Sequence, residues 1–270
     1  MIELSEKVSS VSSLPPELQA GEVHTWLLRL DTDFSQEYLA QCRAHISEAE
    51  WQRCQRRQDG EQARALITRA WVRQTLSRYA QESPRDWSFS DGRHGKPELQ
   101  DPSRPLCFNL SHSGVWLACA VTLDAAVGVD VQRCEEGRDV MRLARRYFDA
   151  QELASLQGLS GRQQTNHFYE LWSLKEAWSK ARGAALPTSL AAVSFVVGDH
   201  GDIRARTAAG QAAESLFLLR PGPGYRLALC LPEPPTGPVT LRFLEAGQDG
   251  AFAVLPWPLL GATGLNAAAP

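Results

Sequence analysis

The 270-residue sequence lacks several features that mark whole classes of protein. Its six cysteines are scattered, with no CxxC pair and no spacing typical of a zinc site. This excludes a disulfide framework and a cysteine-bound metal and indicates reduced thiols. The N-terminal residues are polar and acidic and contain no apolar segment typical of a signal peptide. We therefore expect a cytoplasmic protein.

Long hydrophobic runs and a strong charge of one sign are also missing. The most apolar stretch, residues 251–265, is interrupted by Pro256 and Pro258 and is too short to span a bilayer. The formal net charge of -3 gives no general attraction to nucleic acid or to an anionic membrane surface. Neither kind of partner is expected, and the chain is long enough for one large domain or two small ones.

Hydrophobic periodicity and turn signals predict two successive sets of helices and strands, here called rounds, that have a similar order of elements. The first round has a strand at 23–30, helices at 35–43, from Ser47 and at 61–79, and strands at 107–111 and 115–123. The second has helices opening at 148–152 and covering 168–183, and strands at 192–197, 216–219 and 225–231. Residues 239–244 could add a final edge strand.

This repetition predicts an α+β fold in which two similar halves form an intramolecular pseudo-dimer, with the active site in the cleft between them. We expect four segments: a mobile lead-in at 1–21, an N-terminal α+β half at 22–124, a C-terminal α+β half at 125–246, and a loosely held tail rich in Gly, Pro and Ala at 247–270.

The helix at 168–183 is the segment around which the other motifs gather. Leu171, Leu174, Trp178 and Ala181 share one sector and predict a core-facing stripe, and Gly183 suits a left-handed cap. Glu176 and Lys180 lie four residues apart in another sector. Alone, they could be a surface ion pair worth about 0.2–0.5 kcal/mol to the helix. Lys175 lies in a different sector, and its role stays open.

Three other short segments carry groups suited to chemistry. Asp130 lies between two valines in a strand-like run, where an acid is costly to bury unless it has partners. Residues 109–114, Asn-Leu-Ser-His-Ser-Gly, end in a predicted tight loop with His112 at its tip. Such a loop can offer backbone N–H groups and an imidazole to phosphate oxygens. Lys96 lies in a predicted Gly-Lys-Pro turn.

Together these segments resemble the 4′-phosphopantetheinyl transferase family, specifically its longer, surfactin-synthetase-activating type. The matching motifs are Gly-Lys-Pro at 95–97, Phe-Asn-Leu-Ser-His-Ser-Gly at 108–114, Gly-Val-Asp at 128–130, and Trp-Ser-Leu-Lys-Glu-Ala at 172–177 followed by Lys180. The resemblance covers about residues 46–231. It implies a pseudo-dimer of α+β halves that moves phosphopantetheine from coenzyme A to a serine of an apo acyl or peptidyl carrier protein and releases 3′,5′-ADP.

The resemblance also implies a metal site. Asp130 and Glu176 would be carboxylate ligands of Mg²⁺, which neutralises a pyrophosphate. Many relatives carry a second acid two residues after the strand Asp, where this chain has Gln132. Its amide oxygen can still ligate Mg²⁺ or hold a metal-bound water but brings no charge, so we expect weaker metal binding but not loss of activity. Lys180 would contact the phosphates and stabilise charge developing on the leaving group.

By the same resemblance, the first half would bind coenzyme A. Lys96, Ser111 and His112 would contact its phosphates, Arg64 would lie near the adenine and the 3′-phosphate, and Arg53 near that phosphate. The base that takes the proton of the carrier serine stays open between Glu176, Glu152 in the Phe-Asp-Ala-Gln-Glu stretch, and a metal-held water.

The helix at 139–147 lies where relatives dock the carrier. Arg142, Arg145 and Arg146 would attract an acidic partner, whereas core packing explains its apolar residues equally well. A monomer is expected, because duplicated halves supply within one chain the interface that shorter relatives obtain by oligomerising. Two other functions stay open: a metal-dependent phosphodiesterase or pyrophosphatase acting on a nucleotide, and a carrier-binding module without turnover.

Overall fold

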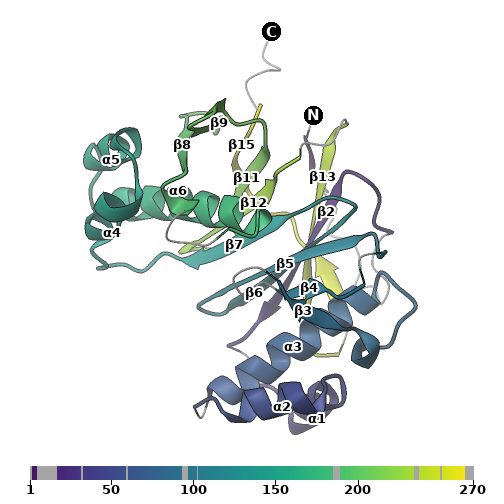
Figure 1. Ribbon diagram of the computed structural model, residues 1–270. Helices are drawn as coiled ribbons and strands as arrows, with labels where there is room; N and C mark the ends of the chain where they lie inside the picture. The colour runs from purple at the N-terminus through teal and green to yellow at the C-terminus, as the bar shows by residue number, and fades with distance from the viewer. Residues whose placement is uncertain are drawn as a thin grey trace.

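The computed structural model describes residues 2–4, 17–31, 33–58, 60–92, 97–101, 103–184, 189–233, 237–249 and 251–264. Helices and strands are mixed along the chain, which confirms the α+β class (Figure 1). The helices are α1 (Gln36–Ala44), α2 (Glu48–Gln55), α3 (Glu61–Ser77), α4 (Val140–Tyr147), α5 (Ala150–Gln157) and α6 (Gly161–Ala181), with a 3₁₀ turn at Pro84–Asp86. Within the described residues, no helix has both the length and the apolar character needed to cross a membrane.

The largest sheet packs against α1, α2 and α3. Its strand order is β1 (Ile2–Leu4), β13 (Val239–Ala246), β2 (Glu22–Arg29), β6 (Trp116–Leu123) and β5 (Leu106–Ser113), and β14 (Phe252–Val254) pairs with β13. One core lies between this sheet and the three helices and includes Trp26, Ile67 and Leu76. A two-stranded ribbon, β3 (Phe89–Asp91) with β4 (Pro97–Leu99), lies beside β5.

A second sheet packs against α6. Its order is β15 (Leu259–Ala262), β11 (Ser215–Leu219), β12 (Tyr225–Leu231) and β7 (Gly128–Arg133). A small third sheet contains β8 (Val193–Val197), β9 (Ile203–Thr207) and β10 (Gly210–Gln211). A second core surrounds α6 and includes Leu171, Leu174, Trp178 and Ala181, which confirms the predicted stripe.

A third core lies between the two large sheets. It contains Val23 and Leu27 of β2, Ala118 and Ala120 of β6, Val129 and Val131 of β7, and Leu227 and Leu229 of β12. These side chains are almost fully buried. The two sheets therefore pack face to face, with the helices on the outside (Figure 1).

The prediction of an edge strand at 239–244 is wrong. β13 lies between β1 and β2 and pairs in parallel with both, so the C-terminal part of the chain returns to the first sheet. The reason is that β13 is apolar on both faces. Leu241 and Phe243 enter the core between the sheets, whereas Leu244 enters the core beneath the first sheet's helices.

Two other predictions about the chain ends also need correction. The tail forms β14 and β15, and Trp257 between them is buried and stacks on Phe243, so residues 251–264 are held in place. In the lead-in, Ile2–Leu4 form β1 and pair with β13. Residues 5–16 lie outside the described part of the chain.

The predicted helix ends are largely confirmed. Ser47 and Glu50 form a capping box at the start of α2, and Asp149 and Glu152 form another at the start of α5. Gly183 has a φ of 58°, and the bond from Ala184 N to Ser179 O closes the end of α6. α6 begins at Gly161, seven residues before the predicted start, because its polar first two turns lack the apolar spacing that marks the rest.

Candidate active site

Gly128 allows α6 to lie directly on β7. A Cβ atom at this position would lie 2.0 Å from the carbonyl oxygen of Ala177 and 2.6 Å from the nitrogen of Ala181. Only a residue without a side chain fits such a contact. Asp130 lies two residues further along β7, so its side chain points to the same face and meets the last turns of α6, which carry Glu176 and Lys180.

Asp130 is buried, and both of its carboxylate oxygens have partners. Oδ1 accepts hydrogen bonds from Lys180 Nζ at 2.5 Å and from Ser111 Oγ at 2.8 Å. Oδ2 accepts a hydrogen bond from Gln132 Nε2 at 2.8 Å. Residues from β5, β7 and α6 therefore meet at one carboxylate. These hydrogen bonds compensate for the cost of burying the Asp130 charge between two valines.

Glu176 lies beside this group. Its Oε2 is 3.8 Å from Lys180 Nζ, so the ammonium lies close to both carboxylates. Burial raises the pKa of Glu176 to about 7, and the neighbouring negative charge of Asp130 raises it in the same direction. The two acids thus repel each other in a partly enclosed site, and a cation between them relieves that repulsion.

The residues present are compatible with Mg²⁺. Within the described ranges, no group of three or more His, Cys, Asp or Glu side chains is placed to hold a metal. Mg²⁺ does not need such a cage, because it keeps several waters and commonly binds one or two carboxylates together with substrate phosphates. Asp130 and Glu176 supply two carboxylates, and the positively charged Lys180 ammonium lies close to both of them.

His112 lies on a strand, not at the tip of a loop as predicted. β5 continues to Ser113, and His112 pairs with Leu117 of β6, so the turn consists of Gly114 and Val115. The imidazole is exposed. Partial enclosure lowers the pKa of His112, and the charges of Lys180 and Arg64 lower it further, so the uncharged form is favoured close to two cations.

The turn after His112 is held from two sides. Arg64 of α3 donates from Nη2 to the carbonyl oxygen of Gly114 at 2.5 Å. Tyr225 of β12 accepts from the Val115 nitrogen at 3.1 Å through its hydroxyl. Arg64 is exposed, and its bond to Gly114 places it near His112.

The structure places Glu152 elsewhere. Its carboxylate is buried, lies 3.0 Å from Lys175 Nζ through Oε2, and accepts from the Phe195 nitrogen at 2.9 Å through Oε1. Oε2 also accepts from the Asp149 nitrogen within the α5 capping box. Both oxygens are committed to the protein interior, which gives no support to Glu152 among the three candidates for the base.

Lys175 is the residue that sequence reasoning missed. Its ammonium is buried and donates to the carbonyl oxygens of Leu190 and Val193 as well as to Glu152. Burial lowers the pKa of Lys175 and raises the pKa of Glu152, while the charge of each partner opposes these shifts. The pair bonds to the Val193 carbonyl and the Phe195 amide of β8, as a neighbouring strand would.

One predicted contributor, Arg53, stays apart from this group. Arg53 is exposed on α2, and the structure gives its side chain no contact with Asp130, Glu176 or Lys180 among the described residues. Lys96 lies outside the described residues.

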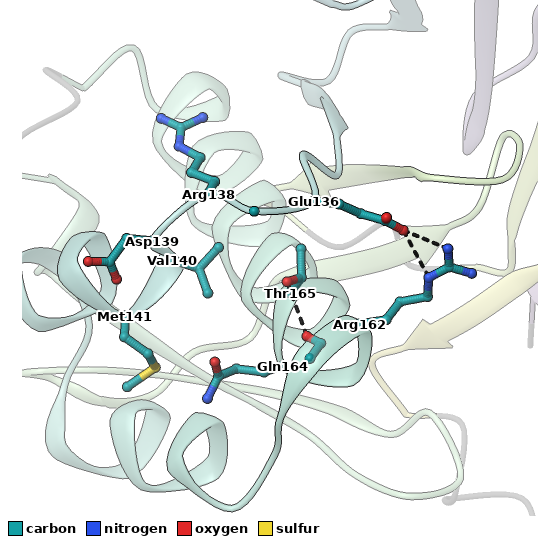
Figure 2. Close-up of a pocket in the computed structure, with 10 residues that line it drawn as sticks. Glu136, Arg138, Asp139, Val140, Met141, Arg162, Gln164 and Thr165 are labelled. Carbon is teal, nitrogen blue, oxygen red and sulfur yellow. Dashed lines mark hydrogen bonds and ion pairs between the residues drawn. The ribbon is translucent and has the colours of Figure 1, made fainter.

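A cleft of about 400 Å³ opens where the segment before α4 faces the start of α6 (Figure 2). Its lining includes Arg138, Asp139 and Met141, and the ion pair between Glu136 and Arg162 borders it. Arg142, Arg145 and Arg146 on the adjoining α4 are exposed, whereas Val140 and Ala144 are buried. The apolar stripe of α4 is therefore partly core, and the arginines are available at the surface.

Comparisons with known proteins show the family to which the chain is similar. A model of the 4′-phosphopantetheinyl transferase superfamily matches residues 126–230. The 4′-phosphopantetheinyl transferase Sfp of Bacillus subtilis (strain 168) is 30% identical over 206 residues, which cover 76% of this chain and 90% of that protein. The 4′-phosphopantetheinyl transferase HetI of a Nostoc species is 34% identical over 174 residues, which cover 63% of this chain and 73% of that protein.

Proposed function

The chain belongs to the 4′-phosphopantetheinyl transferase superfamily, and on that premise we propose that it transfers 4′-phosphopantetheine from coenzyme A to a serine of an apo acyl or peptidyl carrier protein. The second product is 3′,5′-ADP. The observation that carries this proposal is the meeting of Asp130 with Glu176 and Lys180, which come from two separate motifs and lie together where β7 meets α6.

Asp130 and Glu176 would hold Mg²⁺. When bound, the cation would neutralise charge on the pyrophosphate of coenzyme A. Gln132 supplies no negative charge, and its amide donates to Asp130 in the structure, so it would act on the metal through an amide oxygen or through Asp130. This supports weaker metal binding than in relatives that carry an acid at this position.

The remaining groups of the site would bind and activate the two substrates. His112, Arg64, Arg53 and Lys96 would bind the phosphates of coenzyme A. Lys180 would stabilise the charge that develops on 3′,5′-ADP as the pyrophosphate bond breaks. Of the two acids that were candidates for the base, Glu176 lies in the cluster, and we assign it the proton of the carrier serine.

The carrier would approach over α4. Arg142, Arg145 and Arg146 are exposed there and would steer an acidic partner. We also propose that the two sheets with their helices are the halves of a pseudo-dimer and that the protein acts as a cytoplasmic monomer. The face-to-face core of Val23, Leu27, Val129 and Leu229 supports this arrangement, with β13 returned to the N-terminal half.

The direct test is mass spectrometry of an apo carrier after incubation with the protein, coenzyme A and Mg²⁺. The carrier should gain the mass of phosphopantetheine on one serine. Asp130→Asn and Glu176→Gln should each abolish the gain, whereas Glu37→Gln, an exposed acid on α1, should leave it unchanged. Carriers of fatty-acid, polyketide and nonribosomal-peptide type should be tried in parallel, and no modification of any of them would refute transfer.

A parallel incubation with coenzyme A alone separates transfer from hydrolysis. Release of 3′,5′-ADP that needs no carrier would support the phosphodiesterase alternative. Release that occurs only with an apo carrier, in step with its modification, supports the transferase.

A further inference from the structure

The two large sheets meet along a seam between β5 and β7. Each of these strands is at the edge of its own sheet, and no backbone pairing joins them among the described residues. An unpaired strand edge that is buried would leave N–H groups without acceptors, which is costly. The question is what satisfies the edge of β7 that faces β5.

Three side chains of β5 accept hydrogen bonds from the N–H groups along this edge of β7. Asn109 Oδ1 accepts from the Val129 nitrogen at 2.9 Å, Ser111 Oγ from the Val131 nitrogen at 3.1 Å, and Ser113 Oγ from the Arg133 nitrogen at 3.0 Å. Both strands advance by two residues at each step, so alternate side chains of one strand match alternate amides of the other. We name these three residues the seam ladder.

The middle rung of the seam ladder is part of the active-site cluster. Besides accepting from Val131, the Ser111 hydroxyl accepts from Lys180 Nζ at 3.0 Å and donates to Asp130 Oδ1. A hydroxyl has one donor and two acceptor sites, and all three are occupied here. Ser111 therefore holds Asp130 and Lys180 in place, a different task from the phosphate contact predicted from the sequence.

Asn109 and Ser113, the outer residues of the seam ladder, fix the position of Ser111 relative to β7. A slip of one residue between the strands would turn Asp130 to the opposite face of β7, and a slip of two would move it by about 6–7 Å along the strand. Asn109 is buried and Ser113 lies at the other end, so the pair brackets Ser111 on β5. Three side chains thus specify one register between the sheets.

We propose that Asn109 and Ser113 are positioning residues for the transfer reaction, and that they act by holding β7 in the register that places Asp130 against Ser111 and Lys180. The inference deepens the proposed function and rests on it. It also accounts for two residues of the Asn-Leu-Ser-His-Ser motif to which the proposed substrate contacts assign no role.

The test combines kinetics with amide hydrogen exchange measured by NMR. In Asn109→Ala, the Val129 amide should exchange faster while the Val131 amide stays protected. The value of kcat for carrier modification should fall by about tenfold or more with a smaller change in KM, because small misplacements of catalytic groups are expensive. Asn109→Asp restores an acceptor oxygen and should return protection at Val129.

Thr122→Val is the matched control. Thr122 is a buried residue of β6 whose hydroxyl donates to the carbonyl oxygen of Ala125 at 2.6 Å, so its loss removes a side-chain bond to the backbone outside the seam ladder. It should lower the melting temperature and leave kcat unchanged. Ser113→Ala, at the exposed end of the seam, gives a milder variant should Asn109→Ala not fold, with faster exchange at Arg133 and a smaller fall in kcat.

Unchanged exchange at Val129 in Asn109→Ala, or a normal kcat in both Asn109→Ala and Ser113→Ala, would overturn the proposal. The exchange measurement needs no turnover. A wild-type protein that modifies no carrier would therefore refute the proposed function separately, while the exchange data still decide whether the seam ladder exists.

Discussion

Replacing Gly128 by alanine tests whether the close contact between β7 and α6 is what brings Lys180 to Asp130. The added Cβ would lie 2.0 Å from the Ala177 carbonyl oxygen, and Cβ atoms essentially never approach another heavy atom within 3.0 Å. The obstacle is helix backbone, which cannot rotate away as a side chain could. The strand and the helix must therefore separate by about 1 Å.

Two magnitudes follow from that displacement. Overpacking of this kind typically costs about 1–3 kcal/mol of folding stability. The 2.5 Å contact between Lys180 Nζ and Asp130 Oδ1 spans the same interface, so it lengthens with the separation. Because a misplacement of about 1 Å at a catalytic group can cost roughly 100-fold in rate, activity should suffer far more than stability.

The assay compares kcat for carrier modification with the melting temperature of each variant. Gly158→Ala is the control, since its φ is −73° and the nearest atom to its Cβ would lie 3.8 Å away. It should behave like the wild type in both measurements. A Gly128→Ala protein with wild-type kcat would refute the reasoning, because the site would then tolerate separation of α6 from β7.

Three further predictions concern other parts of the molecule. Lys175→Met alone should lower the free energy of unfolding by about 3–5 kcal/mol, because it leaves the Glu152 carboxylate buried without its cation. The double variant Lys175→Met with Glu152→Leu should recover much of that loss, and urea unfolding measures the free energy for both proteins. Burial lowers the pKa of His24 to about 4, so the unfolded chain binds a proton that the folded protein does not between pH 6.5 and about 4, and stability should fall as the pH drops through that window. The fall should be shallower in His24→Gln, as followed by thermal unfolding at a series of pH values, and an equally steep fall would assign it to other groups. Gln132→Glu should lower the Mg²⁺ concentration needed for half-maximal transfer, and an unchanged Mg²⁺ dependence would show that this position does not act on the metal.

Local signals in the sequence were reliable where a single segment determines its own structure. The capping box of Ser47 and Glu50 and the left-handed cap at Gly183 need only neighbouring residues, and both are present as predicted. The approach of Asp130 to Glu176 and Lys180 was predicted through family resemblance, because no spacing in one sequence states which strand lies under which helix.

The errors arose where the outcome depends on distant partners. The run His-Ser-Gly at 112–114 has the composition of a loop, yet His112 and Ser113 extend the strand because they pair with Leu117 and Trp116 of β6. Lys175 showed no sign of burial, since its partners are Glu152 and two carbonyl groups of a later segment. The place of β13 depends on which strand edge was left open, a property of the sheet and not of residues 239–246.

The return of β13 to the first sheet has a consequence for how the protein is made. During translation, β2 leaves the ribosome about 200 residues before β13. Until β13 is made, the edge of β2 that β13 will occupy has no strand beside it. Exposed edges of this kind invite pairing with other chains. A nascent or truncated chain that ends after β12 should therefore be prone to aggregate, and the two halves cannot be cut apart at residue 124 and recovered as separate folded proteins. Because β13 is made after β12, the first half of the protein is completed only after most of the second half has been synthesised.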